Sequence, residues 1–248
     1  MLLLLPVYNE ERYISELLLC VRKSFSGSVL VVDDGSTDST PGYLENLLAE
    51  KKIDHIISHG ANCGYGRALI DGFRFAAEKG HDFVITMDCD IQHLPSFIKN
   101  FESEKASGAD VVSGSRYLDR SLWESSPPED RYLINMRITT LINSITGYRL
   151  TDSFCGFKMY RVSALRKLDL QEDGYGLPCE FWIKAAYAGF RVKEIPVPLI
   201  YKDFTRNFKN MFTSDKDRYA YYLGILEREK KYWLQSGLGS FVSGADAR

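Results

Sequence analysis

The chain has 248 residues, of which 45% are hydrophobic and 26% are charged, which is typical of a globular protein with one large α/β domain or two small ones. Its 31 Lys and Arg residues against 33 Asp and Glu residues give a net charge of −2, so there is no electrostatic basis for nucleic-acid binding. Five Cys residues, an odd number without a C-x-x-C pair, argue against a disulfide framework or a structural zinc site and favour a cytoplasmic protein.

The first expected element is a buried strand over Leu2–Val7. The apolar run that begins it ends at Pro6 and has no basic residues before it, so it is too short for a signal peptide or a membrane span. No transmembrane segment is predicted elsewhere in the chain. We therefore expect a cytoplasmic protein, with peripheral attachment at the inner face of a membrane left open.

Strands and helices are then expected to alternate along the first half of the chain. The helix over residues 10–25 is supported by apolar residues at helical spacing, and apolar runs predict strands over 29–32, 53–58, 83–87 and 110–113. A glycine-containing loop at 62–66 opens a helix over 67–79. This alternation predicts an α/β fold, a Rossmann-like, doubly wound and mostly parallel sheet flanked by helices.

The second half of the chain is less regular. Residues 118–131 are expected to form a loop, followed by a long helix over 131–146, an extended segment over 151–161, a helix over 177–188 and a strand pair over 191–201. We predict one domain over 1–212, with a nucleotide-binding half (1–116) and an acceptor-side half (117–212). An amphipathic helix over 213–235 and a disordered tail over 236–248 would follow, and packing of that helix against the domain or a second subunit leaves a homo-oligomer open.

Two carboxylates, Asp88 and Asp90, follow the strand expected at residues 83–87. Side chains alternate along a strand, so both would project to the same side near its carboxyl end, where open α/β sheets bind ligands. A divalent cation would relieve their repulsion, and oxygen ligands suit Mg²⁺ or Mn²⁺, which can in turn bind a diphosphate. Gln92 could add a neutral oxygen. The Asp-x-Asp spacing alone is weak evidence, because Asp215 and Asp217 share it in a polar segment typical of a helix start.

Acidic residues also follow the first two predicted strands. Glu10 comes after the first strand, and Asp33 and Asp34 end the second. Each could merely cap a helix. Together with Asp88 and Asp90 they would line one edge of the sheet, which helix capping does not predict.

These segments, in this order, resemble those of the family 2 inverting glycosyltransferases of GT-A fold, and most of all the branch that transfers sugars to dolichyl or polyprenyl phosphate. The resemblance covers roughly residues 2–210 and is carried by Pro6-Val7-Tyr8-Asn9-Glu10, Val32-Asp33-Asp34-Gly35-Ser36, Met87-Asp88-Cys89-Asp90-Ile91-Gln92-His93 and Gly114-Ser115-Arg116-Tyr117.

The resemblance implies a nucleoside-diphosphate sugar as donor, UDP- or GDP-linked. It implies that Asp88, Asp90 and Gln92 bind the metal and, through it, the diphosphate. The base and ribose would be held by Pro6, Tyr8, Glu10 and one of the two neighbouring aspartates, Asp33 or Asp34. Of these two aspartates we favour Asp34. Arg116 would lie near the donor phosphates or the acceptor.

Two acidic residues in the second half are candidates for a general base. Asp152 precedes a Gly-Phe pair, Gly156-Phe157, as in the family, and could take a proton from an acceptor hydroxyl or act only as a structural hydrogen-bond acceptor. Glu180 is a second candidate, with a solvent-facing helix position as the alternative. If the acceptor is a phosphate, its oxygen is already anionic and no base is needed.

Arg206 and Lys209 fall where the polyprenyl-phosphate enzymes carry an Arg followed by a Ser-Lys pair, and they could clamp the diphosphate. The Ser-Lys pair is missing here, so the identity of the acceptor stays open. A polyprenyl phosphate is one candidate.

Two other functions are possible for this sequence. One is a sugar-phosphate nucleotidyltransferase, but the Gly-rich basic loop expected after the first strand is absent. The other is a nucleotide-sugar-binding module without catalysis.

Overall fold

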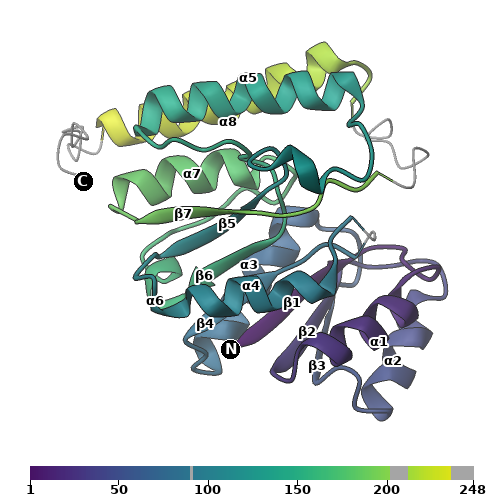
Figure 1. Cartoon of the computed structure of the whole chain (residues 1–248). Coiled ribbons are helices and arrows are strands. Elements are labelled where there is room, and N and C mark those ends of the chain that lie inside the picture. The colour runs from purple at the N-terminus through teal and green to yellow at the C-terminus, as the bar shows by residue number, and fades with distance from the viewer. Residues whose placement is uncertain (90–91, 202–211, 236–248) are drawn as a thin grey trace.

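The computed structural model describes residues 1–89, 92–201 and 212–235 of the chain. Within these residues one seven-stranded sheet has the order β3-β2-β1-β4-β6-β5-β7, and only β6 runs antiparallel to its neighbours (Figure 1). The predicted doubly wound, mostly parallel sheet is therefore confirmed. The strands are β1 (Leu2–Val7), β2 (Ser28–Asp33), β3 (His55–Ser58), β4 (Phe83–Thr86), β5 (Val111–Ser115), β6 (Lys158–Arg161) and β7 (Val192–Pro196).

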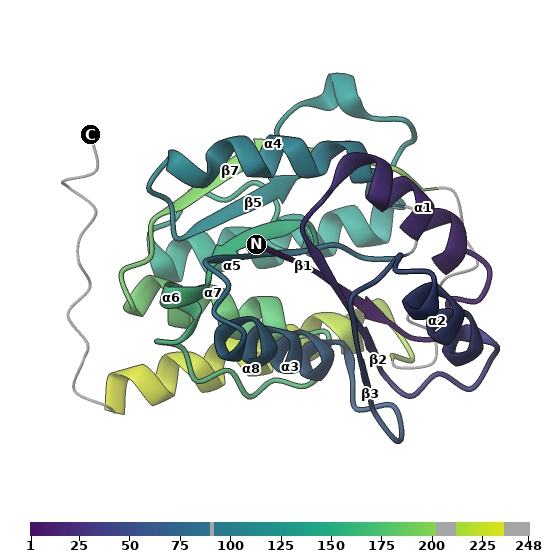
Figure 2. The ribbon, with the colours of Figure 1, turned by 90° about the horizontal axis from the view of Figure 1, so that it is seen from below.

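Helices cover both faces of the sheet (Figures 1 and 2). One core holds buried side chains of α3, α5, α7 and α8, and the other holds those of α1, α2 and α4. The α-helices are α1 (Ile14–Ser24), α2 (Thr40–Ala49), α3 (Tyr65–Glu78), α4 (Ile98–Ser103), α5 (Glu129–Thr146), α6 (Val162–Leu165), α7 (Leu177–Tyr187) and α8 (Asp215–Gln235). The 3-10 helices are η1 (Pro95–Phe97), η2 (Glu104–Ala106) and η3 (Arg120–Leu122).

The side chains of β1, an interior strand of the sheet, pack on both of its faces. Leu2 and Leu4 pack into the core beneath α3, whereas Leu3 and Leu5 pack into the core beneath α1. All four are inaccessible to solvent, because successive side chains of a strand point to opposite faces and both faces carry helices. An uninterrupted apolar run is the pattern expected of such a strand.

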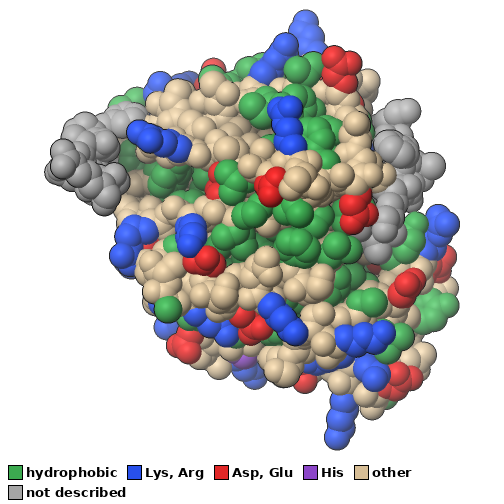
Figure 3. Space-filling view, in the orientation of Figure 1, with side chains coloured by type: hydrophobic (Ala, Val, Ile, Leu, Met, Phe, Trp, Pro, Cys, Tyr) green, Lys and Arg blue, Asp and Glu red, His purple; other side chains and the backbone are tan. Residues whose placement is uncertain are grey.

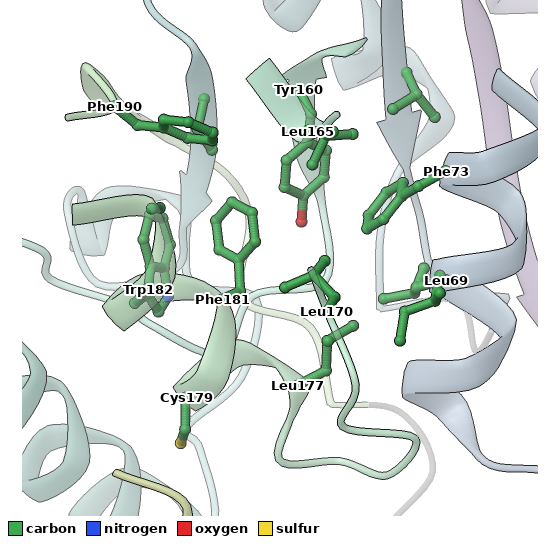
Figure 4. Close-up of a cluster of buried hydrophobic side chains, with 14 of the residues drawn as sticks. Leu69, Phe73, Tyr160, Leu165, Leu170, Leu177, Cys179, Phe181, Trp182 and Phe190 are labelled. Carbon is green, nitrogen blue, oxygen red and sulfur yellow. The ribbon is translucent and has the colours of Figure 1, made fainter. Parts of the chain in front are cut away.

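Aromatic side chains fill the core between α3 and α7 (Figure 4). The ring of Phe73 from α3 meets that of Tyr160 from β6 at 5.1 Å between centroids, and Tyr160 meets Phe181 from α7 at 5.3 Å. Edge-to-face rings at these separations add to the stabilisation that comes from buried area. This packing joins the first half of the chain to the second.

Helix α8 packs against α5 and α7 along the core that contains α3. Trp233, a residue that could have faced a membrane, instead stacks on Tyr187 of α7 at 4.5 Å between ring centroids. No described helix is long and apolar enough to cross a membrane. On the face shown in Figure 3, acidic and basic side chains are interspersed.

The structure differs from the expected elements mainly in the second half of the chain. Of the extended segment at 151–161 only β6 is a strand, and the residues before it form a loop held by side-chain hydrogen bonds. The strand pair expected at 191–201 is the single strand β7, which ends at Pro196, followed by an isolated bridge between Leu199 and Trp123. Cys89, Cys155 and Cys179 are buried, whereas Cys63 is exposed.

Candidate active site

Adjacent strands bring the predicted carboxylates to one edge of the sheet. Strands β2, β1 and β4 are neighbours and run parallel, so the segments that follow them emerge side by side. These segments carry Glu10, Asp33, Asp34 and Asp88. Because β6 runs in the opposite direction, the loop that precedes it reaches the same edge, with Asp152 and Gly156.

The loops after β1 and β2 are tied together by Asn9. Its backbone lies in the left-handed region, with φ of 57°, a conformation that Asn tolerates better than most residues. Its backbone N–H donates to Ser36 Oγ (2.9 Å), and its side-chain Oδ1 accepts from the backbone N–H of Thr37 (2.8 Å). One position further, the N–H of Glu10 donates to Thr40 Oγ1 (2.8 Å). These bonds place Tyr8, which is 44% exposed, beside the buried Glu10.

Both aspartates at the end of β2 are buried and hydrogen-bonded. Asp33 Oδ1 accepts from the N–H of Ser36 (3.0 Å). Asp34 accepts from the N–H groups of Cys63 and Gly64 (both 2.8 Å), and its Oδ1 lies 2.7 Å from His59 Nδ1. A carboxylate offers about four lone-pair sites, so Asp34 keeps capacity for about one further donor. Asp34 therefore shapes the 59–64 loop and can still accept a hydrogen bond from a ligand.

Asp88 is held from several sides. Tyr65 Oη, at the start of α3, donates to Asp88 Oδ1 (3.0 Å), and the Asp88 N–H donates to His93 Nδ1 (3.1 Å). Burial and the charge of Asp88 raise the pKa of Tyr65, which keeps the phenol protonated as a donor. The Asp88 side chain nevertheless remains 30% exposed.

Gly156 backs the Asp88 carboxylate. A Cβ on Gly156 would lie 2.2 Å from Asp88 Oδ2, closer than atoms can approach. The loop that carries Gly156 is fixed because its carbonyl accepts from Thr86 Oγ1 (2.6 Å) and the Cys155 carbonyl accepts from the ammonium of Lys158. The absence of a side chain at position 156 thus makes room for Asp88 at the sheet edge.

His93 is buried behind this carboxylate. Since Nδ1 accepts the Asp88 N–H, the neutral ring carries its proton on Nε2, which lies 3.9 Å from Cys155 Sγ. His93 therefore hydrogen-bonds behind Asp88 and packs against the ring of Phe157. Burial raises the pKa of the Cys155 thiol to about 11, so the sulfur stays protonated at neutral pH.

Arg116, just after β5, forms an ion pair with Asp152, within the loop before β6. Arg116 Nε and Nη2 donate to the two oxygens of Asp152 (2.6 and 2.9 Å), and Asn135 Nδ2 adds a third donor (2.8 Å). Burial would raise the pKa of Asp152, but the charge and hydrogen bonds of Arg116 lower it to about 2. Asp152 is fully inaccessible to solvent. Of its two expected roles, these contacts favour the structural acceptor over the general base.

Lys158 lies buried beneath the same loop. Its ammonium is 5.7 Å from the ring centroid of Trp182, in a cation–π contact. Burial lowers the pKa of Lys158, and the charges of Asp152 and Asp88 oppose this shift. Lys158 also lines a small cavity that Tyr65, Gly156 and Phe181 share. A buried cation therefore lies within the electrostatic reach of both aspartates.

Glu180 does not face solvent. It is fully buried on α7, and its carboxylate accepts from the N–H groups of Gln171 and Glu172 (2.9 and 2.8 Å) and from Lys184 Nζ (2.5 Å). These contacts hold the loop before α7 and argue against a base. That loop in turn lies against the first turn of α3, where the N–H of Arg67 donates to the Asp173 carbonyl (3.0 Å).

Three predicted site residues, Asp90, Arg206 and Lys209, lie outside the described residues. Gln92 is half-buried and follows Asp88 in the same loop, and Pro6 is half-buried at the end of β1. The sequence reasoning missed Tyr65, His59 and the backing role of Gly156. The glycine-containing loop predicted at 62–66 is the signal for Tyr65, because that loop leads into α3 and Tyr65 is the first residue of the helix.

The surroundings of Asp88 suit a divalent metal. Asp88 is a partly exposed carboxylate at a strand end, in a cradle that a Cβ at position 156 would fill, and a tyrosine orients one of its oxygens. Oxygen ligands oriented by a second layer of hydrogen bonds are what Mg²⁺ and Mn²⁺ require.

The chain belongs to glycosyl transferase family 2, whose model matches residues 3–169. It is therefore a glycosyltransferase. It is 31% identical over 206 residues to undecaprenyl-phosphate mannosyltransferase of Micrococcus luteus. The aligned region covers 82% of this chain and 84% of that protein. The chain is 28% identical over 201 residues to polyprenol monophosphomannose synthase of Mycolicibacterium smegmatis (79% and 76% covered).

A third relative is the UDP-N-acetylglucosamine–dolichyl-phosphate N-acetylglucosaminyltransferase of Methanococcus voltae, at 28% identity over 218 residues (82% and 86% covered). Among solved structures, glucosyl-3-phosphoglycerate synthase of Mycobacterium tuberculosis superposes with a TM-score of 0.69 at 17% identity, covering 92% of this chain and 79% of that one. The same enzyme in complex with Mn²⁺, UDP and glucosyl-3-phosphoglycerate gives a TM-score of 0.68. The fold is accordingly GT-A.

Proposed function

We propose that this glycosyltransferase is metal-dependent and inverting, and that it moves a sugar from a nucleoside-diphosphate sugar to the phosphate of a polyprenyl phosphate. The observation that carries the donor half is the row of carboxylates along β2, β1 and β4, with Asp88 held by Tyr65. The acceptor half rests on the relatives, two of which are named for sugar transfer to polyprenyl phosphates.

The nucleotide would lie against the ends of β1 and β2. Tyr8 is exposed there for contact with the base, and Pro6 and Glu10 flank it. Asp34 would accept from a ring N–H of uracil or guanine with the lone pair that His59, Cys63 and Gly64 leave available. Asp33 would contact the ribose. This assignment accounts for two buried carboxylates at a ligand-binding edge.

The metal would be held by Asp88, Asp90 and Gln92. When bound, it neutralises charge that develops on the departing nucleoside diphosphate. Arg116 would supply a fixed positive charge near the phosphates, with Asp152 as the residue that positions it. Arg206 and Lys209 would add cations from their loop.

The acceptor oxygen of a phosphate is already anionic, so the reaction needs no protein base. This agrees with the contacts of Asp152 and Glu180, whose oxygens are used within the protein. The phosphate would attack the anomeric carbon from the face opposite the leaving group in one displacement. The chain's own residues would then orient the two substrates and exclude water, and no covalent enzyme intermediate would form.

The test is a transfer assay with purified protein, polyprenyl phosphate in detergent and a panel of UDP- and GDP-sugars, with Mn²⁺, Mg²⁺ or chelator. We expect one lipid-linked monosaccharide product, formed only with metal, and loss of turnover in Asp88→Asn. A product formed with a soluble hydroxyl acceptor but not with the lipid phosphate would refute the acceptor half alone. Pyrophosphate release from a nucleoside triphosphate and a sugar phosphate would instead show a nucleotidyltransferase.

A further inference from the structure

His59 lies between two carboxylates where β2 and β3 end. Its Nδ1 is 2.7 Å from Asp34 Oδ1, and its Nε2 is 3.2 Å from Asp71 Oδ2 on α3. The exposed side chain of Cys63 completes a group in which one ligand atom each of Asp34, His59 and Cys63 lies within 4.8 Å of the others. Nitrogen, sulfur and oxygen ligands distinguish this group from the oxygen ligands expected around Asp88.

We propose that Asp34, His59 and Cys63 form a second metal site, specific for Zn²⁺ or a similar thiophilic ion. Tetrahedral Zn²⁺ takes imidazole, thiolate and carboxylate ligands at about 2.0–2.3 Å, which sets its ligand atoms roughly 3.3–3.6 Å apart. The three ligand atoms lie within 4.8 Å of one another, so the His59–Asp34 contact would open from 2.7 Å and the separations to Cys63 Sγ would adjust to that spacing. Three protein ligands leave a fourth position for water or an anion.

The surroundings of His59 supply the outer contact that a metal-bound imidazole requires. Metal-ligating His residues usually donate their other ring N–H to a carboxylate, which fixes the tautomer. Here Nε2 is buried and makes no hydrogen bond among the described residues, although Asp71 Oδ2 is 3.2 Å away. Asp71 is itself fixed by Arg67 Nε (2.8 Å) and Arg74 Nη1 (3.0 Å).

Metal binding would make the contact between His59 Nε2 and Asp71 Oδ2 a favourable one. In the neutral tautomer with its proton on Nδ1, the lone pair of Nε2 would face the Asp71 carboxylate. With Nδ1 bound to the metal, the proton resides on Nε2 and points at Asp71. The Cys63 thiol would release its proton to solvent, so that one thiolate and one carboxylate balance the charge of the ion.

The loop already holds these ligands close together. The N–H of Cys63 donates to the same Asp34 oxygen that His59 contacts (2.8 Å), and the thiol bonds only weakly, to the Ala61 carbonyl at 3.3 Å. Reorientation of the exposed Cys63 side chain, together with opening of the His59–Asp34 contact, would complete the site. Because Asp34 is also our proposed reader of the donor base, which rests on the proposed function, Zn²⁺ there would compete with the nucleotide.

The site is tested with Co²⁺, which takes the place of Zn²⁺ and gives a thiolate-to-metal charge-transfer absorption when a Cys ligates it. The protein is titrated in excess Mg²⁺, so that the oxygen ligands around Asp88 are occupied. We expect one thiolate-bound Co²⁺ per chain, displaced by Zn²⁺ and absent in Cys63→Ser. Cys20→Ser is the matched control, since Cys20 is half-buried on α1 and does not belong to this group.

An absent charge-transfer band, or a band that persists in Cys63→Ser, would overturn the proposed metal site.

The competition between Zn²⁺ and the nucleotide is measured separately by calorimetry with UDP and GDP. We expect Zn²⁺ to weaken binding of the preferred nucleotide at least tenfold in the wild type and not in Cys63→Ser. If Co²⁺ binds through Cys63 but nucleotide affinity does not change, the metal site stands and the competition is refuted. If neither nucleotide binds even without Zn²⁺, the proposed donor role fails while the Co²⁺ result still decides the site.

Discussion

Arg116 and Asp152 meet through two parallel hydrogen bonds of 2.6 and 2.9 Å, with the carboxylate entirely inaccessible to solvent. Removal of one partner of such a pair leaves the other charge buried without compensation. Asp152→Asn should therefore lower the free energy of unfolding by about 3–5 kcal/mol. Urea denaturation measures this, with the exposed Asp82→Asn as control; a loss no larger than that of the control would contradict the account.

The same pair predicts how stability depends on acid. The pKa of Asp152 is about 2 in the folded protein and ordinary in the unfolded chain, so the unfolded state takes up a proton first as the pH falls. Its contribution is fully present above about pH 4 and is lost between about pH 4 and pH 2. Denaturation midpoints across this range should fall less steeply in Asp152→Asn than in the wild type. If the midpoints of the wild type and of Asp152→Asn fell in parallel with pH, the Arg116–Asp152 ion pair would not account for the acid dependence.

Tyr65 should tune the metal affinity of Asp88. Tyr65→Phe removes the hydroxyl that donates to Asp88 Oδ1 but keeps the ring that stacks near Tyr175. Loss of such an outer hydrogen bond typically weakens metal binding 10- to 100-fold. We expect the Mn²⁺ concentration for half-maximal activity to rise by about this factor, with a smaller change in kcat at saturating metal. Tyr43→Phe, on the exposed surface of α2, should leave both unchanged.

Gly156 should tolerate no side chain. In Gly156→Ala the new methyl group would overlap Asp88 Oδ2, so Asp88 or the loop must shift. We expect the transfer rate to fall strongly while the midpoint of thermal unfolding changes little, both measured on the same preparation. Gly224→Ala is the control, because its Cβ would meet nothing within 4 Å. Equal activity in the two variants would show that the position of Asp88 is not critical.

Much of the fold was predictable because the first half of the chain carries strong local patterns. The Leu run of β1 and the alternating strands and helices up to residue 115 allow few arrangements other than a parallel sheet. The order of β2, β1 and β4 then brings Glu10, Asp34 and Asp88 to one edge, as the sequence indicated. The antiparallel strand β6 was not foreseen, because its four residues depend on pairing with β4 and β5 and not on a local pattern.

Side-chain roles within the site were harder to predict, since they depend on contacts between residues distant in sequence. Glu180 looks like any helix-surface acid in the sequence, yet it is buried because the loop at 171–172 supplies N–H donors. Asp152 looked equally suited to catalysis or structure until Arg116 and Asn135 were found against it. The exposure of Cys63 likewise depends on how its loop folds against Asp34, which accepts from the Cys63 N–H, and not on a local pattern.

The most direct test of the central claim is nucleotide binding that requires the metal and Asp88. Thermal unfolding is followed with UDP or GDP, with Mn²⁺ or chelator, for wild type and Asp88→Asn. A ligand at 100 times its Kd adds about 2.7 kcal/mol, which should raise the midpoint by about 5–10 °C in a chain of this size. We predict that rise with one nucleotide, only with metal, and only in the wild type. An equal rise in chelator or in Asp88→Asn, or no rise with either nucleotide, would contradict the account.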